Sequence, residues 1–178
     1  MRRRVLLLAL VAALVAGVVA VLSTGLGRDP AATASPLVGR TAPDFTLSGL
    51  DGPAVTLSTL RGQVVIVNFW ASWCAECHDE QDALDQTWQR YRDAGAVVLG
   101  VDFQDTTDGA RDYVHQSGLT YPVVEDKDSR TALAYGIRGI PETFLLDRSG
   151  RIVNRIIGRV DAAVLAAQVD PLVRTAAP

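Results

Sequence analysis

The sequence predicts a three-layer α/β fold with a central mixed β-sheet, preceded by one apolar helix. Largely apolar runs at 64–70 and 96–102 are typical of strands that are covered on both faces. Between these runs, and between other short apolar runs, lie segments whose apolar residues recur at spacings of three and four, as in helices. Helices that alternate with strands in this way indicate helical layers on both sides of a sheet.

The N-terminus carries the features of a membrane anchor. Arg2, Arg3 and Arg4 precede an apolar run at 5–22, which as a helix would extend about 27 Å, close to the roughly 30 Å hydrocarbon core of a bilayer. We expect residues 1–4 to be a cytoplasmic stub and 5–22 to be a single transmembrane anchor. A cleaved signal peptide is the alternative, but the nearest small-x-small triplet, at 32–34, lies well beyond the apolar run.

The rest of the chain is expected to lie on the extracytoplasmic side. Residues 23–36, rich in Gly, Ala, Ser and Thr, predict a flexible linker to a folded domain at 37–178. Thirteen of the 17 basic residues and all 20 acidic ones follow Arg28, so this part carries about −7 at neutral pH. That charge argues against nucleic acid as a partner.

The elements follow one another in a regular order. Turn residues and alternating patterns predict a hairpin with strands at 45–47 and 55–57, and a two-strand unit at 142–147 and 152–157. The other expected strands lie at 64–70, 96–102 and 121–124, and the expected helices at 74–92, 107–116, 129–135 and 160–174.

The only two cysteines, Cys74 and Cys77, follow the first buried strand and open the helix behind it. At a helix N-terminus, unpaired N–H groups and the macrodipole stabilise a thiolate, so Cys74 is the expected nucleophile. Cys77, one turn further on, is shielded and placed to attack a mixed disulfide on Cys74. The pair therefore predicts thiol–disulfide exchange.

Three other uses of this pair are possible. A structural disulfide across so short a loop stabilises little, on the order of 2 kcal/mol. A zinc site lacks ligands, because only His78 and His115 accompany the two cysteines. The run from Cys74 to His78 also matches the attachment motif of c-type haem. A haem would need a second axial ligand besides His78, and the only methionine of the sequence is Met1. We expect no metal and no cofactor.

Glu80 is an unusual member of the apolar stripe of this helix, which is formed by Cys77, Glu80, Leu84, Trp88 and Tyr91. A carboxyl one turn after Cys77 on the core-facing side should lose part of its hydration, which raises its pKa and suits it to proton transfer. The alternative is that Glu80 turns to solvent and only complements the macrodipole.

These motifs resemble the thioredoxin superfamily. Strand, Trp73-Cys74-x-x-Cys77, helix and a later Gly139-Ile140-Pro141 occur in the order of that family. The resemblance implies a cis peptide bond before Pro141, with the Ile140 backbone facing the cysteines, where an extended substrate can pair with it. It also implies that Trp73 and Glu142 border this substrate site.

Segments 38–47, 104–126 and 141–147 are similar to the membrane-anchored, extracytoplasmic members typified by ResA, TlpA and CcmG. In that subfamily 104–126 is an αβ insertion. Asn68 replaces the buried Asp of thioredoxins there, and Glu80 stands at the acidic position. The resemblance implies reduction of protein disulfides, including those of apocytochrome c, with electrons from a membrane thiol–disulfide donor.

One departure leaves the direction of electron flow open. Glu76 stands where reducing members usually carry Pro before the second cysteine, and its negative charge disfavours a nearby thiolate. This charge favours a reducing couple, but no residue excludes an oxidase that introduces disulfides, which is one alternative function. A peroxiredoxin is another, although Ala71 stands where it needs Thr or Ser. The third alternative is a copper chaperone that uses both cysteines and a histidine.

Overall fold

The computed structural model describes residues 2–26 and 36–175. The chain divides into one unit that ends at Ala34 and another that begins at Ser35. The described residues of the first unit form one helix, α1 (Arg2–Leu26). Residues 27–35, most of the predicted linker, lie outside the described part.

The membrane anchor predicted at 5–22 falls within α1. A search of the described residues found no helix with the length and apolar character that crossing a bilayer requires. Part of the predicted anchor, including Val5 and Leu22, lies outside the residues whose side chains the structure describes. The anchor is therefore still a prediction.

The second unit is built on a seven-stranded mixed sheet with the strand order β2-β1-β5-β4-β3-β6-β7. Strands β3, β4 and β5 run parallel in the centre, and β6 pairs with β3 antiparallel. The strands are β1 (Thr46–Gly49), β2 (Val55–Thr56), β3 (Val64–Trp70), β4 (Ala96–Phe103), β5 (Val123–Asp126), β6 (Glu142–Leu146) and β7 (Ile152–Ile157).

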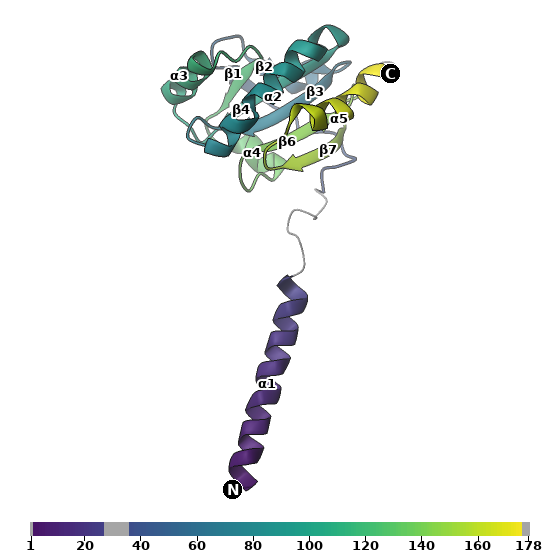
Figure 1. Ribbon diagram of the computed structural model, residues 1–178. Helices are drawn as coiled ribbons and strands as arrows, with labels where there is room; N and C mark the ends of the chain where they lie inside the picture. Colours follow the sequence, from purple (N-terminus) through teal and green to yellow (C-terminus); the bar gives the residue numbers. More distant parts are fainter. Residues whose placement is uncertain (1, 27–35, 176–178) are drawn as a thin grey trace. The chain divides into compact units, whose positions relative to one another are not determined.

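Helices cover the sheet on both faces, as the α/β prediction requires (Figure 1). Leu84, Ala110 and Leu165 pack into one cluster on the same face, whereas Ala132 and Tyr135 pack into a second cluster on the other. The α-helices of this unit are α2 (Ala75–Tyr91), α3 (Thr107–Ser117), α4 (Arg130–Tyr135) and α5 (Ala162–Arg174). Among the described residues, α4 shares its face with the short 3₁₀ helix Leu57–Leu60. The predicted three-layer architecture is confirmed.

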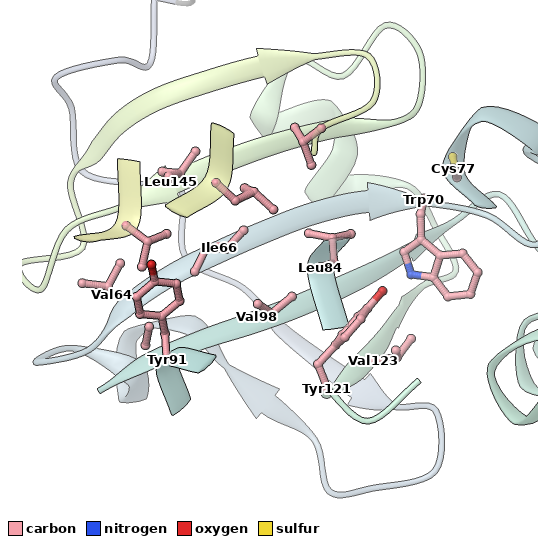
Figure 2. Packing of buried hydrophobic residues seen from close by; sticks show 14 of the residues in the cluster. Val64, Ile66, Trp70, Cys77, Leu84, Tyr91, Val98, Tyr121, Val123 and Leu145 are labelled. Carbon is pink, nitrogen blue, oxygen red and sulfur yellow. The ribbon is translucent and has the colours of Figure 1, made fainter. Parts of the chain in front are cut away.

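The core holds β3 in place from both faces up to its last residue. All seven residues of β3 are buried, with Ile66 and Trp70 on the α2 face and Val67 and Phe69 on the other. Figure 2 shows Trp70 with Cys77 beyond it at the end of the strand. Because this strand is fixed on both faces, the turn that follows starts from a rigid point.

The structure shifts the bounds of several predicted elements, mostly by one or two residues, and two of these shifts need an explanation. The strand predicted at 121–124 instead spans β5, because Glu125 and Asp126 pair with Asp102 and Phe103 of β4. The helix predicted from residue 160 begins at Ala162, where the Asp161 side chain accepts the N–H of Val164. The second change leaves the N–H of Val160 free to meet another partner.

Gly100 in β4 provides a test of this packing. A Cβ at this position would lie 2.9 Å from Trp70 Nε1 and 3.1 Å from Tyr121 Cε2. We expect Gly100→Ala to lower the free energy of unfolding by about 1–3 kcal/mol because this core has no room for a methyl group. Urea denaturation measures the change. Gly52→Ala, whose Cβ meets nothing within 4 Å, is the control, and equal losses in both variants would contradict the packing argument.

Candidate active site

The turn between β3 and α2 places Cys74 at the start of the helix. Cys74 is the N-cap of α2, and its sulfur lies 3.2 Å from the backbone nitrogen of Cys77, which donates to it. This is the position at which free N–H groups stabilise negative charge on sulfur. The helix-start geometry predicted for Cys74 is confirmed.

The two cysteines form a disulfide, so the structure represents the oxidised form. Cys74 retains 7% of its accessible surface, whereas Cys77 retains none. An incoming thiol or disulfide therefore reaches Cys74 first. The exposure of the two cysteine residues agrees with the order of attack inferred from the sequence.

Glu80 is fully buried and holds a network together. Its Oε1 accepts a hydrogen bond from Asn68 Nδ2 at 2.6 Å, and its Oε2 accepts the N–H of Val160 at 2.9 Å. The same Asn68 amide donates to Thr143 Oγ1 on β6 at 3.0 Å. Glu80 thus faces the core, and the alternative in which it turns to solvent is wrong.

The environment of Glu80 prepares it to exchange a proton. Burial raises the pKa of Glu80 to about 7, although the hydrogen bonds from Asn68 and Val160 act in the opposite direction. A carboxyl with a pKa near the working pH both accepts and returns a proton readily. The partial desolvation expected from the stripe is confirmed.

The residues in front of Cys74 are fixed by side chains. Trp73 is exposed, with 60% of its surface accessible, and its indole N–H donates to the carbonyl of Gln104 at 2.9 Å. His78 contacts the carbonyl oxygen of Ser72 through Nε2 at 2.7 Å and stacks on Tyr113. The histidine of the haem-like motif is therefore engaged within the protein.

The peptide bond between Ile140 and Pro141 is cis, as the resemblance implied. Pro141 comes directly before β6, whose Glu142 pairs with Phe69 near the end of β3. Glu142 is buried and forms an ion pair with Arg155 of β7. This pairing orients the start of β6. Among the described residues, no group of three or more His, Cys, Asp or Glu is arranged to hold a metal ion.

Comparison with known proteins places this geometry in a family. A model described as "AhpC/TSA family" matches residues 38–155. The chain belongs to this family. It is 38% identical over 157 residues to the thiol:disulfide interchange protein DsbE of Allochromatium vinosum, an alignment that covers 86% of this chain and 85% of that protein.

Two further relatives point the same way. The thiol-disulfide oxidoreductase ResA of Bacillus anthracis is 33% identical over 121 residues, which cover 68% of this chain and 70% of that protein. The crystal structure of a secreted thiol-disulfide isomerase from Corynebacterium glutamicum superimposes with a TM-score of 0.70 at 33% identity, over 75% of this chain and 86% of that one. The chain is thus a thiol-disulfide oxidoreductase of the AhpC/TSA family, with Cys74 and Cys77 as its cysteine pair.

Sequence reasoning missed part of the site. It identified the stripe residue Glu80 but not its partner Val160, which is 80 positions away. It also missed the contact of Asp105 with the turn, where Oδ2 accepts the N–H of Ser72 at 2.6 Å. No local pattern marks either contact, because both depend on how separate elements meet.

The raised pKa of Glu80 makes stability depend on pH. Since the folded state raises this pKa from 4.5 to about 7, it binds the proton more tightly than the unfolded state, and its stabilisation is lost as pH rises through that interval. The free energy of unfolding should therefore fall as pH rises. We expect Glu80→Gln to remove the part of this fall that Glu80 causes, up to about 3 kcal/mol. Urea denaturation of the oxidised protein at pH 5 and pH 8 measures it.

The control is Glu76→Gln, because Glu76 is exposed on the same helix. That variant should retain the pH dependence of the unmodified chain. If Glu80→Gln also retains it in full, Glu80 titrates in the folded protein as it does in the unfolded chain.

Proposed function

We propose that this chain reduces protein disulfides on the extracytoplasmic side of a membrane, and that apocytochrome c is among its substrates. The observation that carries the proposal is the buried Glu80, one helical turn after Cys77. A carboxyl at this position disfavours thiolates nearby and supplies a proton acceptor in place of the non-ionising Asn68. A couple whose reduced form is not stabilised as thiolate is a reductant.

The reaction has two steps. The Cys74 thiolate attacks one sulfur of the substrate disulfide, so that a mixed disulfide forms and the other substrate sulfur leaves as a thiolate. Cys77 then passes its proton to the Glu80 carboxylate and attacks the Cys74 sulfur. The second substrate thiolate leaves, and the oxidised pair remains, as in the structure. The substrate gains the two electrons that the cysteine pair loses.

A substrate segment would dock between the turn and the cis-proline. Trp73 offers an exposed aromatic surface beside the cysteines, and the Ile140 backbone before Pro141 offers groups that pair with an extended chain. Glu142 acts through its ion pair with Arg155, which holds the start of β6 in place.

In this proposal the N-terminal segment anchors the chain in the membrane, with the cysteine pair on the extracytoplasmic side. Arg2 to Arg4 and the apolar residues 5–22 support an uncleaved anchor with a cytoplasmic N-terminus. The oxidised product then needs a membrane thiol–disulfide donor that returns it to the dithiol. This arrangement carries electrons outward to substrates in an oxidising compartment.

The redox potential of the Cys74–Cys77 couple tests the direction of electron flow. We expect a value nearer to the roughly −270 mV of thioredoxin than to the roughly −120 mV of strongly oxidising disulfide donors. Equilibration of the full-length protein with dithiothreitol buffers, read by Trp fluorescence, provides the number. A potential at the oxidising end would instead support the oxidase alternative.

The exposure of the two cysteine residues predicts which variant traps substrates. Cys77→Ser should accumulate mixed disulfides on Cys74 because the second step is blocked, and apocytochrome c should be found among them. Cys74→Ser is the matched control and should trap almost nothing. Non-reducing gels followed by mass spectrometry identify the partners. Trapping by Cys74→Ser alone would reverse the assigned roles, and a set without apocytochrome c would remove that substrate from the proposal.

A further inference from the structure

The backbone of Ser72, two residues before Cys74, is held by groups from two other elements. Asp105, in the loop between β4 and α3, accepts the Ser72 N–H at 2.6 Å through Oδ2. His78 of α2 contacts the Ser72 carbonyl oxygen at 2.7 Å. The next residue, Trp73, bonds to Gln104 in the same loop. The turn that presents the nucleophile is therefore attached to the β4–α3 loop through side chains.

The loop is shaped to make these contacts. Gln104 has φ +53°, in the left-handed region that residues other than glycine seldom occupy. Asp105 Oδ1 accepts the N–H of Thr106 at 2.7 Å, which leaves Oδ2 directed at Ser72. A Cβ on Gly109 would lie 3.2 Å from both Asp105 Oδ1 and Ser72 Oγ. Glycine at this position lets the first turn of α3 close over the contact.

A second carboxyl is buried on the strand that ends before this loop. Asp102 of β4 is 4% exposed, and within the described residues its Oδ1 has no hydrogen-bond partner. Its neighbour in the sheet is Glu125 of β5. Glu125 is itself bound by Thr107 Oγ1 at 2.5 Å and paired with Lys127 at 3.4 Å. Asp105 is thus the acid of this region that bonds to the active-site turn.

We propose that Asp105 is a positioning residue for Cys74 and that it fixes the active-site turn through Ser72. The proposal rests on the assignment of Cys74 as the attacking thiol, and it holds for either direction of electron flow. Asp105 acts in two ways. Its oxygen keeps the turn in the form that lets the Cys77 N–H meet the Cys74 sulfur, and its negative charge disfavours the thiolate.

Two variants with the same charge separate these effects. Asp105→Asn and Asp105→Ala both remove the carboxylate, but only the Asn side chain keeps an oxygen for the Ser72 N–H. We expect the Ala variant to have a higher Cys74 pKa than the Asn variant, and to be alkylated at pH 7 about tenfold more slowly, since one charge-stabilising contact is lost. Iodoacetamide labelling of the reduced full-length protein across pH, read by peptide mass, measures both quantities.

The controls fix how the result is interpreted. Asp108→Asn removes a carboxyl that is 94% exposed on α3 and should change neither the Cys74 pKa nor the labelling rate. Cys74→Ser should abolish the labelling, and labelling that persists would show that the attacking thiol was wrongly assigned. If Cys74 is the labelled thiol and the two Asp105 variants have equal Cys74 pKa values, the contact of Asp105 with Ser72 does not position Cys74 and the proposal fails.

Discussion

The burial of one carboxyl, that of Glu80, connects the elements that form the site. Its oxygens bind Asn68 on β3 and the N–H of Val160 ahead of α5, and Asn68 extends the network to Thr143 on β6. An unpaired charge in the apolar layer between α2 and the sheet is costly, so Glu80 needs these contacts. They also leave Asn68 Oδ1 without a partner among the described residues. The fold therefore retains a polar group in its core at a cost to stability, which is characteristic of functional sites.

Acidic groups approach the cysteine pair from two sides. Glu80 lies in α2 one turn after Cys77, whereas Asp105 bonds to Ser72 ahead of Cys74 and Asp102 is buried near the end of β4. Both sets oppose the thiolate that the helix N-terminus favours. The balance between these effects determines how reducing the couple is, because the potential depends on how well the reduced form is stabilised. The same balance connects redox chemistry to proton transfer in the proposed mechanism.

The β4–α3 loop connects the inserted segment to catalysis. The resemblance identifies residues 104–126 as an αβ insertion but assigns them no part in the active site. In the structure, Gln104 and Asp105 hold Trp73 and Ser72, and Gly109 leaves space for this contact. The insertion thus shapes the turn before Cys74 in addition to extending the sheet.

The sequence by itself determined the features that depend on neighbours along the chain. The apolar run of β3, the spacing of Cys74 and Cys77, and the helical stripe that buries Glu80 follow from local periodicity, and the structure confirms them. The cis bond before Pro141 came from resemblance alone. Only the tertiary structure decided what Glu80 and Ser72 bind, because Val160 and Asp105 lie 80 and 33 positions away. It also decided that Glu125 and Asp126 belong to a buried strand, since parallel pairing with β4 places these acids inside although their charges suggest a turn.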